Sequence, residues 1–116
     1  MFDFHNLNVY KKAKESNHNI FLFLKRGTFI DKYLQDQLKR ASISVVINIA
    51  EGSGKLSKPD RRNFYTIARG SVYECVSLLE IIEEEYSITK GEEIKDLKSS
   101  LEEISKMLFG LIRSQK

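Results

Sequence analysis

Apolar residues recur at helical spacing between Gln35 and Arg69, most densely in the run from Gln37 to Gly52. One stripe at steps of three and four residues comprises Leu34, Leu38, Ala41, Val45 and Ile49, and a second stripe comprises Ile43, Val46, Ile47 and Ala50. A helix on the surface of a monomer needs only one apolar stripe. The second stripe therefore predicts that this helix is central to its bundle, or packs against another subunit.

Caps and periodicity predict the bounds of this helix, the second in the chain, and of its two neighbours. The first runs from an N-cap at Asn6 to about Leu24, and Gly27 stops it. The second opens at Thr28–Asp31 and ends at two glycines, Gly52 and Gly54, that permit left-handed backbone. The third begins after the cap Ser57 and ends near Tyr86, with an inner stripe of Phe64, Ile67, Ala68, Ser71, Cys75, Leu78 and Ile82.

A fourth helix follows the capping box Thr89–Glu92. Its heptad seam comprises Ile94, Leu97, Leu101, Ile104, Leu108 and Leu111. Strand-like alternation and low-complexity linkers are absent from the sequence. The pattern therefore predicts an all-α, antiparallel up-down-up-down four-helix bundle in one domain, residues 1–116.

Composition agrees with a compact intracellular domain. The 116 residues are 41% hydrophobic and contain one cysteine, Cys75, so that no intrachain disulfide can form. The longest apolar run, from Ile20 to Leu24, is far shorter than a membrane span, and the first residues lack the features of a signal peptide. We expect a cytoplasmic protein without a membrane partner.

The net charge of +3 conceals an uneven distribution. Residues 1–70 hold 13 Lys and Arg against 6 Asp and Glu, whereas residues 71–116 hold 6 against 10. A basic first part beside an acidic last part can recruit a polyanion or match subunits to one another.

The residues of common catalytic sites do not come together in this sequence. Gly52–Lys55 lacks the spacing of a nucleotide-binding loop and follows a helix. The histidines, His5 and His18, have no second ligand at metal spacing, and Cys75 falls on an inner stripe. We expect no enzyme activity, no catalytic residues, no metal and no cofactor.

Basic and aromatic residues instead favour binding. Arg62, Tyr65, Arg69 and Tyr73 follow one face of the third helix, Lys39 and Arg40 are expected across from Arg69, and the hairpin tip gathers Lys55, Lys58 and Arg61. The cations can neutralise phosphates, and tyrosines can stack on unpaired bases. Equally, Tyr65 and Tyr73 can pack against a neighbouring subunit together with Ile43, Val46, Ile47 and Ala50.

Two polar residues in the second helix are expected to be structural. Asn48 lies among apolar residues, where a polar side chain often fixes packing register. Glu51 lies in the last turn, where Arg61 or Arg62 could neutralise it.

The run from Gln37 to Gly52, followed by Phe64–Ser71 and Glu74, resembles the bacterial four-helix-bundle family named after proteins encoded in 23S rRNA intervening sequences. The opening Phe4–Ala13 also fits, although Tyr10 replaces a commoner tryptophan. The resemblance implies a ring-shaped homopentamer, and the family is similar to pentameric retroelement accessory proteins that bind RNA and a reverse transcriptase. The matching motif positions are Gln37, Arg40, Asn48, Glu51, Gly52, Gly70, Ser71 and Glu74, of which most are expected to be architectural.

Together these observations predict a non-enzymatic homo-oligomeric bundle that binds structured nucleic acid, with RNA as the expected class. The alternative is an oligomeric scaffold or adaptor that docks a protein partner, with its charges serving assembly.

Overall fold

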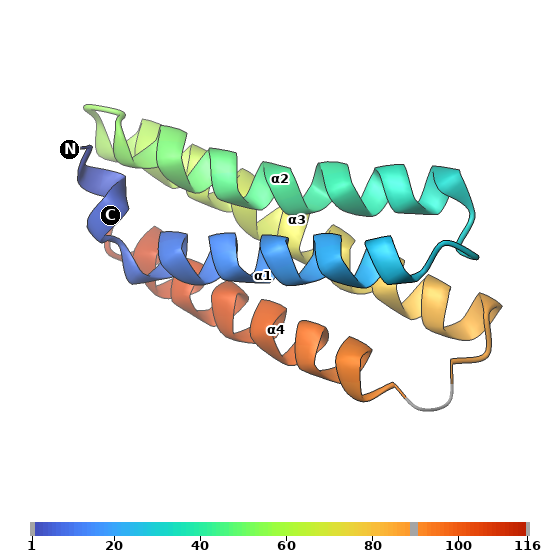
Figure 1. Ribbon diagram of the computed structural model, residues 1–116. Helices are drawn as coiled ribbons and strands as arrows, with labels where there is room; N and C mark the ends of the chain where they lie inside the picture. The colour runs from blue at the N-terminus through green and yellow to red at the C-terminus, as the bar shows by residue number, and fades with distance from the viewer. Residues whose placement is uncertain (1, 89–90, 116) are drawn as a thin grey trace.

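Four long helices pack side by side in the computed structural model, which describes residues 2–88 and 91–115 (Figure 1). They are α1 (Asn8–Arg26), α2 (Lys32–Ser53), α3 (Lys58–Glu85) and α4 (Glu92–Arg113), preceded by a 3₁₀ turn, Asp3–Asn6. The described residues contain no strand, which confirms the all-α prediction. Both chain ends lie at the same end of the bundle as the α2–α3 loop, and the α1–α2 loop lies at the opposite end (Figure 1).

Helix caps follow the predictions at some ends and not at others. Ser57 caps α3 as expected, because its hydroxyl accepts a hydrogen bond from the Asp60 amide at 3.2 Å. The first helix begins at Asn8 rather than after Asn6, since the preceding residues form the 3₁₀ turn. Gly54 adopts a right-handed conformation, so the prediction of a left-handed stop there was wrong. The predicted capping box of α4 includes residues 89 and 90, which lie outside the described residues.

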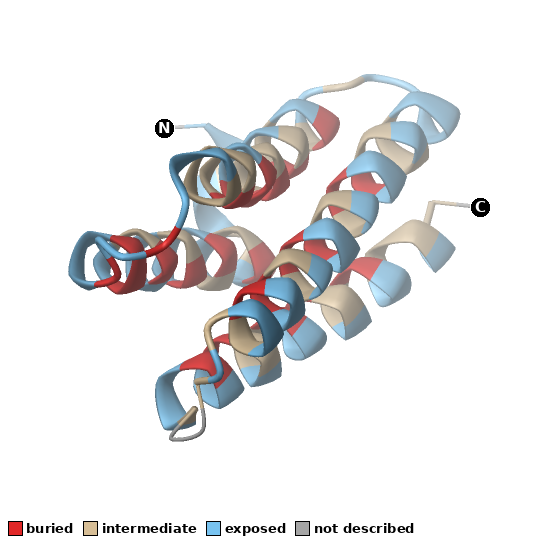
Figure 2. Cartoon of the chain, turned by 90° about the vertical axis from the view of Figure 1, so that its right-hand side faces the viewer, coloured by how far each residue is buried: buried red, intermediate tan, exposed pale blue. Residues whose placement is uncertain are grey.

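The core is built from one stripe of each helix (Figure 2). In α3 the buried residues are Tyr65, Ala68, Val72, Cys75, Leu79 and Ile82. The predicted stripe was therefore wrong in part, because Phe64, Ser71 and Leu78 are only half-buried and Ile67 is exposed. The reason is that α3 packs against both α2 and α4, so its buried face is turned towards a point between them.

The second apolar stripe of α2 faces away from the core. Ile43 and Ile47 are 40% and 47% exposed, and Val46 and Ala50 are half-buried at their flank. Within this one chain α2 is therefore an outer helix, in contact with α1 and α3, and not the central one. We call Ile43 and Ile47 the outer ridge.

Candidate nucleic-acid interface

Arg61 holds together the loop between α2 and α3. Its Nη1 donates to the backbone oxygens of Lys55 and Leu56, each at 2.9 Å, and its Nε donates to Oε1 of Gln115 at 2.7 Å. Because one rigid guanidinium satisfies three acceptors, it links the loop to the end of the chain beyond α4. The sequence-predicted role for Arg61 was phosphate binding, and the structure adds this architectural role.

The remaining cations at this end lie around the hydrogen bonds that Arg61 makes with the loop and with Gln115. Arg62 donates from Nη1 to the backbone oxygen of Gln115 at 3.0 Å. The ammonium group of Lys55 lies 4.8 Å from the ring centre of Phe64, and Lys58 is exposed. We call Lys55, Lys58, Arg61 and Arg62 the cationic end.

Arg69 lies two turns further along α3, between two aromatic rings. Its guanidinium carbon is 5.0 Å from the ring centre of Tyr73 and 5.4 Å from that of Phe109 in α4. Its Nη2 also donates to the Tyr73 hydroxyl at 3.0 Å. The guanidinium of Arg113 reaches the same Phe109 ring at 5.7 Å. Arginine and aromatic side chains thus alternate across the α3–α4 edge.

The predicted single basic face is not formed. Lys39 turns towards α1, with its ammonium group 5.7 Å from the Phe21 ring centre, whereas Arg69 turns towards α4. Arg40 is exposed and stands one turn before Ser44, whose hydroxyl contacts Ser71 of α3. The expectation that Lys39 lies across from Arg69 was wrong, because Lys39 contacts Phe21 of α1 instead. The cationic end and Arg69 thus share α3 and its preceding loop, and Lys39 lies apart from them.

The predicted phosphate ligands share one electrostatic property. Within residues 2–88 and 91–115 none of Lys39, Arg40, Lys55, Lys58, Arg61, Arg62 and Arg69 makes an ion pair. The ion pairs use other cations: Lys12, Arg26, Lys32, Lys98 and Lys106. Arg61, Arg62 and Arg69 instead bond to neutral groups, which leaves their positive charge uncompensated.

A short polar chain joins α2 to α3. The Asn48 amide donates to the Ser44 hydroxyl at 3.0 Å and to the Ser44 backbone oxygen at 2.9 Å. The hydroxyls of Ser44 and Ser71 are 2.8 Å apart. Asn48 and Ser71 therefore have the architectural contacts expected of them. Glu51 is exposed and makes no ion pair within the described residues, because Arg61 and Arg62 bond to other groups.

The remaining motif positions differ in their surroundings. Gly52 is buried against the rings of α3, Gly70 is exposed with open space around it, and Glu74 is exposed. Gln37 is half-buried on α2. Close packing within one chain thus explains why a glycine is needed at position 52, whereas no contact among the described residues explains the glycine at position 70.

Two tyrosines expected at a subunit interface lie in different places. Tyr65 is only 3% exposed, and burial raises the pKa of its phenol, which the Arg61 charge partly offsets. It belongs to the core, so its placement at an interface was wrong; the aromatic ring fills the space beside Gly52. Tyr73 is 55% exposed and remains on the surface.

Two properties of the described residues bear on nucleophilic and metal chemistry. Cys75 is buried, and desolvation, with a smaller effect of the Glu74 charge, raises the pKa of its thiol to about 12, so the reactive thiolate is suppressed. Among residues 2–88 and 91–115, His, Cys, Asp and Glu side chains form no group of three that could hold a metal ion. A search of the same residues finds no helix long and apolar enough to cross a membrane.

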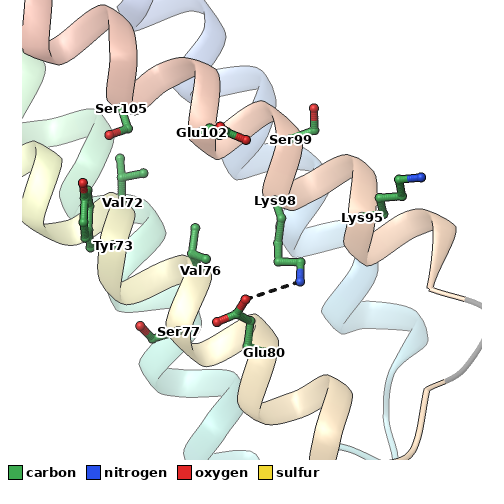
Figure 3. Close-up of a pocket in the computed structure, with 10 residues that line it drawn as sticks. All are labelled: Val72, Tyr73, Val76, Ser77, Glu80, Lys95, Lys98, Ser99, Glu102 and Ser105. Carbon is green, nitrogen blue, oxygen red and sulfur yellow. Dashed lines mark ion pairs between the residues drawn. The ribbon is translucent and has the colours of Figure 1, made fainter.

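A groove of about 600 Å³ lies between α3 and α4, on the far side of Tyr73 from the other cation–aromatic contacts (Figure 3). Val72 and Val76 contribute apolar side chains to it, and Tyr73 lies at one end. Glu80 and Glu102 also line it, with Lys98 held by Glu80 at 3.5 Å. The carboxylates make this groove a poorer phosphate site than the cationic end.

Sequence reasoning missed Phe109, Arg113 and Gln115. Phe109 and Arg113 are four residues apart on α4, outside its heptad seam. An exposed aromatic residue with a cation at this spacing is a signal that the sequence did contain. No local pattern signals the Gln115 contacts, since their arginine partners lie more than fifty positions away.

The fold and these side chains define an all-α four-helix bundle whose loop end carries cations without ion-pair partners among the described residues. The model of the 23S rRNA-intervening sequence proteins matches residues 5–110, and the chain belongs to this family. It is also similar to the crystal structure of a protein of unknown function from the S23 ribosomal protein family of Bacteroides thetaiotaomicron VPI-5482. The two are 25% identical, with a TM-score of 0.81, over 90% of this chain and 97% of that one. No curated protein matches the chain.

Proposed function

We propose that this protein is a non-enzymatic, homo-oligomeric bundle of up-down-up-down order that binds structured RNA through its cationic end. The observation that carries the proposal is the absence of ion pairs, within the described residues, at every predicted phosphate ligand. Uncompensated cations attract a polyanion, whereas paired ones do not. The family name supports an RNA of ribosomal origin as the class to test first.

Charge is distributed along the bundle in a way that favours one end. Lys55, Lys58, Arg61 and Arg62 surround the α2–α3 loop, beside Arg113 at the end of α4. At the other end α3 finishes with Glu83–Glu85 and α4 begins with Glu92 and Glu93, of which Glu83 and Glu93 pair with Lys98 and Arg26. The loop end also holds Asp3, Glu51 and Asp60, but its cations outnumber them. A nucleic acid is therefore attracted more to the loop end than to the opposite one.

The proposal is tested by RNA binding at several salt concentrations. Each lysine that neutralises a phosphate adds about one to the slope of log affinity against log salt. The double variant Lys55→Gln, Lys58→Gln should bind a structured rRNA fragment more weakly, with a slope smaller by about two. Neither lysine donates a side-chain hydrogen bond among the described residues, so the fold should be retained.

The matched control is Lys32→Gln, Lys106→Gln, which removes the same charge from two lysines that pair with acids on their own helices. It should leave the slope unchanged. Equal loss of affinity in both double variants would mean that net charge alone governs binding, and would overturn the assignment to this end. Failure of the unaltered protein to bind at low salt would remove RNA binding altogether.

The oligomer is supported by the outer ridge. Two isoleucines about half exposed on one helix face, with the exposed Ile67 on α3, are costly for an isolated chain and typical of a surface that another molecule covers. A second copy, in the ring that the family resemblance implies, would cover it. The same surface is the feature that favours the alternative function, an adaptor that docks a protein partner.

A further inference from the structure

We infer that Arg69, Tyr73, Phe109 and Arg113 form a stacking platform for unpaired RNA bases. This inference rests on the proposed RNA-binding function and specifies which part of the RNA is recognised. The four side chains come from two helices that are adjacent along their length, so the site exists only in the folded bundle.

In the platform, arginine and aromatic side chains are stacked on one another, and the aromatic rings keep part of their surface open to a further stacking partner. The Arg69 guanidinium lies within 5.4 Å of two ring centres, and Arg113 lies near the same Phe109 ring. Tyr73 and Phe109 are nevertheless 55% and 48% exposed, so much of each ring remains in contact with solvent. Aromatic faces beside guanidinium groups are the arrangement that proteins use to stack single-stranded bases.

The charge of the platform is unsatisfied within the described chain. Neither Arg69 nor Arg113 makes an ion pair there. Arg69 Nε is buried and has no hydrogen-bond partner among the described residues, which is costly for a charged group. That atom is closed to solvent, so an RNA group could meet the positive charge only at another part of the guanidinium.

The surroundings indicate how an RNA strand would approach. Arg62 precedes Arg69 by two helical turns, about 10 Å along α3, so cations continue from the cationic end to the platform. On the other side of Tyr73 the groove contains Glu80 and Glu102 beside Lys95 and Lys98, so it offers no excess of positive charge (Figure 3). The backbone is therefore held towards the loop end, and the bases that reach the platform are those of a loop or a bulge. Paired bases are already stacked within their duplex and cannot reach it.

The experiment compares two labelled RNAs of the same length, a hairpin with an unpaired loop and a fully paired duplex. Phe109→Leu should weaken hairpin binding about tenfold, because base–aromatic stacking is worth about 5- to 150-fold in affinity per base. Duplex binding and the salt slope of the hairpin should not change, since leucine leaves every cation in place.

The matched control is Phe29→Leu, which alters another exposed phenylalanine, located in the α1–α2 loop. It should bind both RNAs as the unaltered protein does. Tyr73→Leu should repeat the effect of Phe109→Leu on the hairpin, and circular dichroism should show both variants folded.

Four results would overturn the inference. Unchanged hairpin affinity in Phe109→Leu, with the unaltered protein binding, would exclude stacking and leave the proposed function standing. An equal loss on hairpin and duplex with a smaller salt slope would mean that Phe109 only positions cations. A change in oligomer size without a change in RNA affinity would assign the platform to a subunit contact. If the unaltered protein binds neither RNA, the proposed function and this inference fail together.

Discussion

Two helical glycines, Gly52 and Gly110, have opposite surroundings. A Cβ atom at Gly52 would lie 2.8 Å from Cε1 of Tyr65 and 3.0 Å from Cβ of Phe64. A Cβ atom at Gly110 would meet nothing within 4 Å. Glycine in a helix interior costs about 1 kcal/mol relative to alanine, mainly in chain entropy. Close packing compensates that cost at Gly52, and nothing within the described chain compensates it at Gly110.

We therefore predict that Gly110→Ala stabilises the protein by about 1 kcal/mol. Urea unfolding followed by circular dichroism should show a higher midpoint with an unchanged slope. Gly52→Ala provides the contrast and should lower the midpoint, because the Tyr65 ring is fixed in the core and cannot move away. A Gly110→Ala midpoint at or below that of the unaltered protein would show that its open surroundings do not persist in solution.

At the scale of helices, sequence reasoning located the elements well and their faces less well. The cap at Ser57 and the break around Gly54 follow from local chemistry, which a sequence displays directly. The buried face of α3 was misplaced by about one position, as Tyr65 and Phe64 illustrate. Both residues are apolar enough for a core, and only the direction of α4 decides between them.

The candidate site was predictable to a similar degree. Basic residues at helical spacing identified Arg61, Arg62 and Arg69, because charge and spacing are visible in the sequence. The joining of α3 to Gln115 and Phe109 was not visible, since these contacts bridge distant parts of the chain. Tertiary packing, rather than any local signal, determines which cations remain near one another.

The α2–α3 hairpin gives a prediction at this scale. Arg61→Lys keeps the charge but loses the planar group that bonds Lys55, Leu56 and Gln115. Hydrogen exchange should become faster at the amides of residues 54–57. The free energy of global unfolding should change little, because the Arg61 hydrogen bonds lie near the surface. The salt slope for RNA should be retained.

Arg40→Lys is the control for this change, because Arg40 is exposed and has no side-chain hydrogen bond among the described residues. Its exchange pattern should match that of the unaltered protein. Unaltered exchange at residues 54–57 in Arg61→Lys would mean that the loop is held by its own backbone contacts alone.

At the scale of the whole molecule, the proposed oligomer depends on the outer ridge. Ile47→Asp places a charge where a second copy would have to exclude water, so we predict a smaller species by light scattering. The side chain is 47% exposed in one chain, so the substitution should leave each bundle folded. Ile81→Asp, at a similarly exposed position on α3, is the control and should leave the size unchanged.

A single monomeric species for the unaltered protein at micromolar concentration would contradict the ridge interpretation and the ring. The sequence predicted the ridge residues from their periodicity. It could not reveal whether they face a neighbour within the chain or another subunit, because both arrangements require the same apolar pattern.

The separation of charge along the bundle has a consequence for how the protein meets its ligand. The bundle is 45 Å long, and at physiological ionic strength a charge is screened within about 8 Å. Its two ends are therefore electrically independent, and the net charge of +3 describes neither of them. If the protein binds RNA as we propose, a nearby polyanion would turn the loop end forward before contact. Encounters would then begin in one orientation, with the acidic end directed outward, away from the strand.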